Sequence, residues 1–192
     1  MSEPIQAFPS QWPPGCCGIR LNGIRELHAI LDETDRDLVE RFEWWAHENG
    51  CGSVYARTVI YDGRWRRNVF MHRLLLGEPR TRIDHRNGDG LDNRRHNLRL
   101  ATASQNAANM RPKGGSSQFK GVKRTRSGSW AARITIDYRQ LHIGTFGDEL
   151  VAAAAYDIYA AALFGEFARP NLGVQFGIIN AARDEGLERS RA

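Results

Sequence analysis

The strongest structural signals of this 192-residue chain lie in one stretch, IDHRNGDGLDNRRHNLRLATASQN at residues 83–106. At its start, Arg82–His85 can form a short strand. The residues at 87–90, Asn-Gly-Asp-Gly, have the composition of a turn. Leu98–Ala101 can then return as a second strand. The stretch therefore predicts a hairpin with a polar loop.

A helix should follow this hairpin directly. Thr102 and Gln105 have the spacing of a capping box, with Thr102 as the N-cap residue. Asn106 then falls in the first helical turn and faces back toward the hairpin. The order strand, loop, strand, helix is therefore expected to bring the amide of Asn106 close to Asp84 and His85.

The polar side chains of this stretch suit hydrolysis of a phosphodiester, which needs an activated water and a cation on the developing charge. A neutral imidazole at His85 is a base near pH 7. The carboxylate of Asp84 and the amide oxygen of Asn106 are hard ligands that suit Mg²⁺ or Mn²⁺ rather than Zn²⁺. Three arginines are placed to meet phosphates: Arg94, Arg95 and Arg99.

An Asp-His pair alone would fit a surface turn as well as a catalytic site. The spacing to Asn97 and Asn106 and the flanking Asn-Gly and Arg-Arg pairs favour catalysis. Two other histidines have plainer interpretations. His72 is expected to pack structurally at the end of a strand, and His96 is expected to be exposed.

The stretch resembles the HNH (ββα-metal) endonucleases, in the subgroup found among phage and intron homing enzymes. It has the Asp-His-x-Asn-Gly, Leu-Asp-Asn-Arg-Arg-x-Asn-Leu-Arg and Ser-Gln-Asn runs of that subgroup. The resemblance implies that His85 is the general base, that Asp84 and Asn106 bind the metal, and that Asn97 braces the loop and orients His85. Asn106 replaces the last His of the family name. The resemblance extends upstream through residues 71–74 to 31–33 and Trp44.

The residues before this stretch predict short strands at Ile19–Leu21, His28–Leu31, Val54–Ile60 and Arg66–Met71. One helix is predicted between them, over Asp32–Trp45, from its apolar spacing. Trp44 and Trp45 are both expected to lie in a core rather than to stack on bases.

The residues after it predict a second domain. Residues 111–117, Arg-Pro-Lys-Gly-Gly-Ser-Ser, have the composition of a flexible linker. Three strands are expected beyond it, followed by an Ala-rich helix that ends at Gly165. The strands are expected at Phe119–Arg124, Trp130–Asp137 and Gln140–Ile143, and the helix from Asp148 to Phe164. The last twenty residues are expected to form a short helix and a frayed tail.

This second domain resembles the ethylene-response-factor (APETALA) type of DNA-binding domain, in runs such as Phe119–Lys123 and Gly144–Phe146. The resemblance implies a three-stranded antiparallel sheet that enters the DNA major groove, backed by a helix. Trp130 and Phe146 would be core residues under that helix. The base preference is not carried over, because several DNA-facing positions differ from the family pattern. One face is expected to bind DNA through Lys120, Lys123, Arg124, Arg126, Arg133, Arg139, Gln140 and His142.

The charge distribution agrees with a nucleic-acid partner. Residues 57–146 hold 19 Lys/Arg against 6 Asp/Glu, whereas the segments on either side are mildly acidic. A central basic block is the footprint expected for phosphate contacts. The alternative is a solvated basic surface without a ligand. The three cysteines, Cys16, Cys17 and Cys51, lack CxxC pairs and are expected to be reduced thiols.

The predicted fold class is α+β, with a ββα-metal nuclease domain and a small three-stranded antiparallel sheet with one packed helix. The predicted order is an irregular arm, an HNH endonuclease domain, a linker, an APETALA-type domain and a C-terminal tail. These segments span residues 1–17, 18–110, 111–116, 117–172 and 173–192.

The sequence predicts a metal-dependent endonuclease that cuts duplex DNA by nicking or double-strand cleavage. We expect no membrane partner, no signal peptide and no obligatory protein partner, and a homodimer is compatible with the chain. The expected location is the cytoplasm, that of the host cell for a phage protein. Two alternatives stay open: a non-catalytic DNA-binding regulator on a decayed nuclease scaffold, and a nuclease or binder of RNA.

Overall fold

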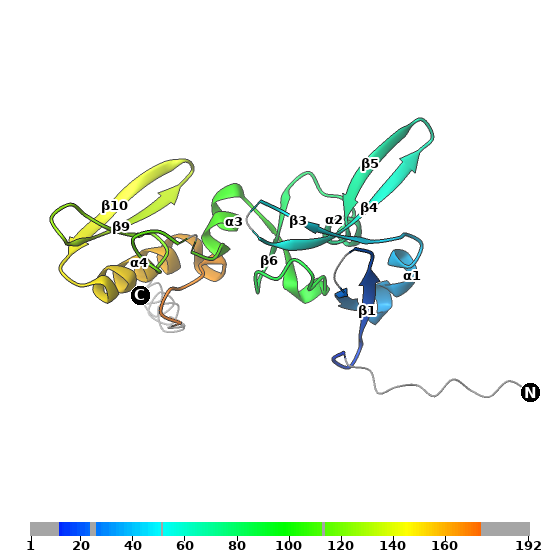
Figure 1. Cartoon of the computed structure of the whole chain (residues 1–192), viewed down its shortest axis with the longest axis horizontal. Helices are drawn as coiled ribbons and strands as arrows, with labels where there is room; N and C mark the ends of the chain where they lie inside the picture. Colours follow the sequence, from blue (N-terminus) through cyan, green and yellow to red (C-terminus); the bar gives the residue numbers. More distant parts are fainter. Residues whose placement is uncertain (1–11, 24–25, 51, 113, 174–192) are drawn as a thin grey trace, which may run out of the picture. The chain divides into compact units, whose positions relative to one another are not determined.

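The computed structural model describes residues 12–23, 26–50, 52–112 and 114–173 (Figure 1). The chain divides into two compact units, Met1–Thr102 and Ala103–Ala192. Small antiparallel sheets and few helices make up both units, as predicted for an α+β protein. The division falls before the predicted linker, and the predicted domain bounds stay predictions.

The described part of the first unit contains three antiparallel sheets. Strand β1 (Cys16–Leu21) pairs with β2 (Leu27–Asp32), so Cys16 and Cys17 belong to a strand and not to the predicted arm. A second sheet has the order β3 (Trp45–Glu48), β4 (Val54–Asp62), β5 (Trp65–Phe70). The third is the hairpin of β6 (Arg82–His85) and β7 (Leu98–Ala101), with the predicted bounds.

The core of the first unit lies between these sheets and short helical turns. Leu31, Val39, Trp44 and Met71 are its largest apolar side chains that are almost fully buried. The turns are η1 (Glu33–Asp35), α1 (Arg36–Val39), α2 (Met71–Leu75) and η2 (Arg95–Asn97). Because α2 starts at Met71, His72 lies in a helix and not at the end of the predicted strand.

The predicted helix over Asp32–Trp45 is wrong in extent, because it is limited to η1 and α1. The indole Nε1 of Trp44 donates to the carbonyl of Val39 at 2.8 Å and so occupies the end of α1. Trp44 is buried as predicted, but Trp45 turns outward as the first residue of β3 and is 39% exposed. Two adjacent residues of an extended chain point to opposite sides, so both tryptophans could not enter one core.

In its described residues, 103–112 and 114–173, the second unit contains two helices, a sheet and a final helical turn. The sheet has the order β10 (Arg139–Phe146), β9 (Trp130–Ile136), β8 (Val122–Arg124). Helix α4 (Glu149–Phe164) packs on it, and α3 (Ala103–Asn109) and η3 (Gly165–Phe167) lie at the end of α4. A three-stranded antiparallel sheet with one packed helix is therefore present, with β8 shorter than the predicted strand.

Small side chains bring α4 close to the sheet. Ala152, Ala153 and Ala160 are at most 1% exposed. Asp148 caps the helix by accepting from the amides of Leu150 and Val151 at 2.7 and 3.1 Å. By length and composition alone the run Glu149–Phe167 could cross a membrane, but core helices pass the same test. The buried alanines facing the sheet account for its apolar composition.

The remaining predictions concern the linker, the cysteines and the two ends of the chain. Ser116 and Ser117, in and beside the predicted linker, bond into the second unit: their hydroxyls accept from the amides of Arg124 and Phe119, both at 3.0 Å. Among described cysteines, Cys16 and Cys17 carry free thiols. Cys51, most of the predicted arm and the tail from residue 174 lie outside the described residues.

Candidate active site

Asp84 and His85 end strand β6, and both side chains are buried, at 4% and 6% exposure. The register of the β6–β7 hairpin places Asp84 opposite Arg99. Both Nε and Nη2 of Arg99 lie 2.8 Å from Oδ2 of Asp84, and Arg99 itself is only 8% exposed. A phosphate that binds Arg99, as predicted, would therefore have to share its guanidinium with Asp84 or displace that carboxylate.

The imidazole of His85 lies among aromatic rings. Its ring centroid is 5.0 Å from that of His72 and 5.8 Å from that of Tyr55. Burial lowers the pKa of His85, while the neighbouring Asn93 amide and the Asp84 carboxylate act in the opposite direction. Burial, with the nearby His85 and Arg73, lowers the pKa of His72 to about 3. Both imidazoles are therefore neutral near pH 7, which is the form that a general base requires.

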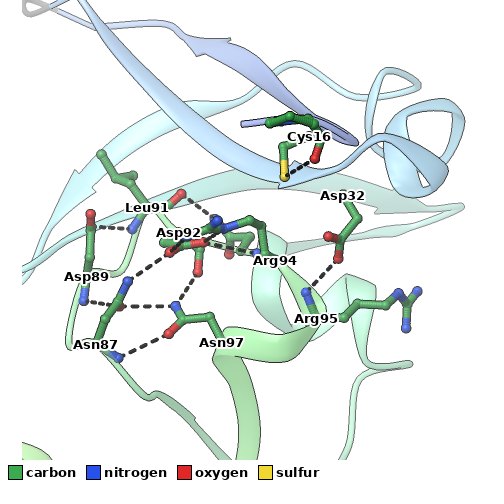
Figure 2. Close-up of polar contacts among 11 residues, drawn as sticks. Cys16, Asp32, Asn87, Asp89, Leu91, Asp92, Arg94, Arg95 and Asn97 are labelled. Carbon is green, nitrogen blue, oxygen red and sulfur yellow. Dashed lines mark hydrogen bonds and ion pairs between the residues drawn. The ribbon is translucent and has the colours of Figure 1, made fainter. Parts of the chain in front are cut away.

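The loop between β6 and β7 is held by the side chain of Asn97 (Figure 2). Its Oδ1 accepts from the amide of Asn87 at 3.0 Å. Its Nδ2 donates to the carbonyl of Asp92 at 2.7 Å and to Oδ1 of Asn87 at 3.1 Å. Asn97 is 3% exposed, so these bonds satisfy an amide that is shielded from water. The predicted bracing of the loop corresponds to these contacts.

Two arginines of the loop are engaged by carboxylates of their own unit. Arg94 binds Asp92 through Nε at 2.8 Å and Nη2 at 2.7 Å, and Arg95 binds Asp35 at the same two distances. The backbone amide of Arg95 also donates to Asp32 at 2.7 Å (Figure 2). Burial would raise the pKa of Asp92, but bonds from Arg94 outweigh it and lower that pKa. A phosphate would have to compete with these ion pairs, and His96 beside them is exposed as predicted.

Asn106 lies in α3, which belongs to the second unit and follows Thr102 directly. The helix begins where the predicted cap requires. Its carboxyl end is held by Lys120, whose Nζ donates to the carbonyls of Ala107 and Met110 at 2.7 and 3.1 Å and to that of Ala108. The juxtaposition of Asn106 with Asp84 and His85 stays a prediction.

Helix α3 has a second attachment within its unit. The hydroxyl of Ser104 donates to Oδ1 of Asp137 at 3.0 Å and accepts from the amide of Asp137 at the same distance. Asp137 and Tyr138 both have positive φ angles, 44° and 65°, and form the tight turn between β9 and β10. Both ends of α3 are therefore secured by residues of the second unit.

The predicted DNA-binding residues of the second unit do not all share a face. The pairs His142↔Arg133 and Gln140↔Thr135 lie on the sheet face away from α4, and Lys123, paired with Ala131, points the same way. Arg124 pairs with Trp130 and Arg139 with Ile136, which are positions on the helix side. Arg126 is in the turn after β8, and the ammonium of Lys120 is bound to α3. One common face thus contains four of the eight: Lys123, Arg133, Gln140 and His142.

The metal ligands predicted from the sequence are oxygen donors, the carboxylate of Asp84 and the amide oxygen of Asn106. No group of three His, Cys, Asp or Glu suitable for a metal occurs among residues 12–23, 26–50, 52–112 and 114–173. A site that relies on one carboxylate, one amide oxygen and water fits Mg²⁺, which usually keeps several waters. It does not fit Zn²⁺, which prefers nitrogen and sulfur ligands.

Several residues around the site were not singled out from the sequence. Asn93 is fully buried beside His85, and Tyr55 comes from β4. The Leu-Asp-Asn-Arg-Arg run contains Asn93, so the motif could have indicated it. Tyr55 carries no such signal, because only the tertiary fold brings β4 to His85.

Comparison with known proteins assigns the region around Asp84 and His85 to a family. The family model described as HNH endonuclease matches residues 77–108, from before β6 to within α3. An uncharacterized HNH endonuclease of Acanthamoeba polyphaga mimivirus is 33% identical over 138 residues, which are 70% of this chain and 69% of that protein.

Two Arabidopsis thaliana proteins are similar over shorter ranges. Dehydration-responsive element-binding protein 2C is 40% identical over 63 residues, 32% of this chain and 18% of that protein. An AP2/ERF and B3 domain-containing transcription factor is 48% identical over 40 residues, 21% of this chain and 11% of that protein. The chain thus covers less than a fifth of either plant protein.

Proposed function

The chain belongs to the HNH endonuclease family, and on that premise we propose that it hydrolyses phosphodiester bonds of duplex DNA with one divalent cation. The second unit would hold the nuclease on duplex DNA. The observation that carries the proposal is the buried Asp84–His85 pair at the end of β6, followed by a loop that Asn97 braces. The similarity to two plant proteins named for element binding and transcription supports DNA as the partner.

We assign the catalytic roles residue by residue. His85 is the general base, and Asn97 fixes the loop next to it. Asp84 and Asn106 would hold Mg²⁺ or Mn²⁺, because both offer oxygen ligands. When bound, such an ion would supply a Lewis acid that stabilises the charge developing on the phosphate.

The buried, neutral imidazole of His85 is suited to the proton transfer. An imidazole nitrogen takes a proton from the attacking water as the new bond to phosphorus forms. The bond to the 3′ oxygen breaks, and that oxygen leaves with a proton from solvent. The products are a 5′-phosphate and a 3′-hydroxyl.

Duplex binding by the second unit is assigned to the exposed sheet face with Lys123, Arg133, Gln140 and His142. A binding module tethered to a nuclease raises the local concentration of the nuclease at its site. One active site cuts one strand, so a double-strand break would need two copies or two events. A homodimer and a cytoplasmic location remain part of the proposal.

A non-catalytic DNA-binding regulator is the second candidate, and one observation favours it. The carboxylate of Asp84 is already neutralised by Arg99 at 2.8 Å, as would suit a scaffold that no longer binds a cation. An RNA-directed nuclease has less support. It would require aromatic side chains that stack on bases on the sheet face of the second unit, and the described strand positions on that face hold no Phe, Tyr or Trp.

The deciding experiment is cleavage of supercoiled plasmid by the wild type and by His85→Ala, with Mg²⁺ or with EDTA, at matched concentration. The proposal expects nicking by the wild type with Mg²⁺ only, and duplex binding without cleavage by His85→Ala. If both proteins bind duplex and neither cuts any DNA offered, including a library of sequences, the regulator replaces the nuclease.

A further inference from the structure

The β3–β4–β5 sheet of the first unit has two chemically different faces. Ala46 and Ala56 point to the core, and Thr58 and Val69, paired further along the same face, are each 2% exposed. Because side chains alternate along a strand, the residues between these positions point to the opposite side. We call that side the outer face.

The outer face combines arginines with exposed aromatic rings. The register pairs Trp45 with Arg57 across β3 and β4, and Tyr61 with Arg66 across β4 and β5. Trp45 is 39% exposed and Tyr61 is 71% exposed. Among the described side chains of these strands, no Asp or Glu lies on this face, since Glu48 pairs with Val54 on the other.

The outer face is continuous with the candidate active site. Tyr55 and Phe70 lie on it, with ring centroids 6.0 Å apart. Tyr55 contacts His85 at 5.8 Å and Phe70 stacks on His72 at 5.5 Å. A strip of side chains thus runs from the general base outward along β4 and β5, whose hairpin projects from its unit (Figure 1).

The dimensions of this strip match a nucleic-acid duplex. The six steps from Tyr55 to Tyr61 span about 20 Å at the usual rise of a strand. That length corresponds to roughly six base pairs. A two-stranded ribbon is narrow enough to lie in the major groove, and arginines without neighbouring carboxylates attract phosphates.

We propose that this outer face, with Trp45, Arg57, Tyr61 and Arg66, is a second duplex-DNA-binding surface, separate from the sheet of the second unit. It rests on the proposed function in one respect, that the substrate of the nuclease is DNA. It would hold the duplex that lies beside His85. Trp65 and Arg67 take no part, because they are on the opposite face, where Arg67 binds Glu78.

Two double variants of the full chain test this surface. Tyr61→Ala/Arg66→Gln removes one aromatic and one cation from the outer face. Trp65→Ala/Arg67→Gln is the matched control, since it removes the same two chemistries from the opposite face of the same hairpin. Thermal unfolding first verifies that both variants are folded.

Binding to a random-sequence duplex is measured by fluorescence anisotropy in EDTA, over a range of salt concentrations. The outer-face variant should bind several-fold more weakly at low salt, and its slope of log K against log salt should fall by about 0.9 for the lost phosphate contact. The control should keep the wild-type slope. Equal losses of affinity and salt slope in both variants would overturn the proposal. So would no loss in either variant, and that result would favour a protein partner for the outer face.

The EDTA condition separates this proposal from the catalytic one. If the wild type fails to cut with Mg²⁺ while the outer-face variant alone loses slope, the nuclease assignment fails and the surface stands. If the wild type cuts and the slopes are all equal, the surface fails and the nuclease stands. Ultraviolet cross-linking to bromodeoxyuridine-substituted duplex gives a second readout, because adducts should map to Tyr61 or Trp45 and not to Trp65.

Discussion

The carboxylate of Asp84 and the guanidinium of Arg99 lie opposite each other on the β6–β7 hairpin and form a buried ion pair at 2.8 Å. The charge of the Asp84 carboxylate is thus neutralised, beside His85, before any cation binds. Arg99 was predicted to bind phosphate, but in the structure it forms an ion pair with Asp84, the residue that we assign to the metal.

Replacing Arg99 should therefore destabilise the protein and increase its dependence on divalent cations. Arg99→Met leaves the Asp84 carboxylate buried without its partner, at a cost of about 3–5 kcal/mol in the free energy of unfolding. Added Mg²⁺ or Mn²⁺ should restore part of this loss, since binding only to the folded state stabilises it. Chemical denaturation with and without the ion measures both effects. A variant that is equally unstable in both conditions would argue against cation binding at Asp84.

The buried imidazole of His72 should make stability depend on pH. Its pKa is lowered from 6.5 to about 3, so the unfolded chain takes up a proton below pH 6.5 and the folded protein does not. The contribution of the neutral His72 imidazole to the free energy of unfolding is therefore complete above pH 6.5 and is lost as the pH falls toward 3. His72→Phe keeps a ring stacked on Phe70 and removes the titration. Between about pH 7.5 and pH 5, the variant should lose about 2 kcal/mol less stability than the wild type in denaturant titrations.

The bonds of Asn97 should control the loop that follows His85. Asn97→Ala removes its contacts to Asn87 and to the carbonyl of Asp92, and each unsatisfied buried group costs about 1–3 kcal/mol. Amide hydrogen exchange at Asn87 should accelerate, and plasmid nicking should fall with it. The exposed neighbour His96 provides the control, because His96→Ala should change neither quantity. Unchanged exchange at Asn87 would contradict the bracing role.

Lys120 and Lys123 should respond differently to the same substitution. Lys120 binds the carboxyl end of α3, whereas Lys123 is exposed on the sheet face. Lys120→Met should speed amide exchange in α3 and leave the salt dependence of duplex binding unchanged. Lys123→Met should lower the salt slope by about 0.9 and leave α3 unchanged. A reduced slope for Lys120→Met would restore the original DNA-binding prediction for that residue.

Gly121 should be intolerant of any side chain. Its φ is +73°, and a Cβ there would lie 2.2 Å from the ring of Tyr156 and 2.5 Å from the carbonyl of Arg133. Gly121→Ala should lower the free energy of unfolding by about 1–3 kcal/mol from backbone strain, with the clash adding to it. Gly128 has a φ of +89° with nothing within 4 Å, so Gly128→Ala isolates the backbone effect. An equal loss of unfolding free energy in the two variants would show that the ring of Tyr156 and the carbonyl of Arg133 move to relieve the clash.

The elements with local signals were predictable from the sequence. The bounds of β6 and β7 follow from the turn residues between them, and Asp148 and Gly165 mark the ends of α4. The helix over Asp32–Trp45 was overestimated, because the periodicity of Leu38, Val39 and Phe42 continued beyond the point where Trp44 caps α1. A tertiary contact overrode a local pattern there.

The site was predictable at the level of its motif and less so in its contacts. Asp84, His85 and Asn97 occur together because the motif spans one hairpin and its loop. The partner of Arg95 and the packing of Tyr55 on His85 depend on distant segments. Helix α3 was assigned to the nuclease from its sequence, but its packing partners come from the second unit.

The attachment of α3 to residues of the second unit has a consequence for the ancestry of the gene. The HNH family match ends within α3, whereas the residues that bond to that helix, Lys120 and Asp137, come from the rest of the second unit. Exchange of the two modules by recombination at the Gly-Ser segment would leave α3 without those bonds. The two modules are therefore expected to have been inherited together, with substitutions at Lys120 accompanied by changes at the end of α3. The nuclease and the module that follows it would thus evolve as one unit rather than as interchangeable modules.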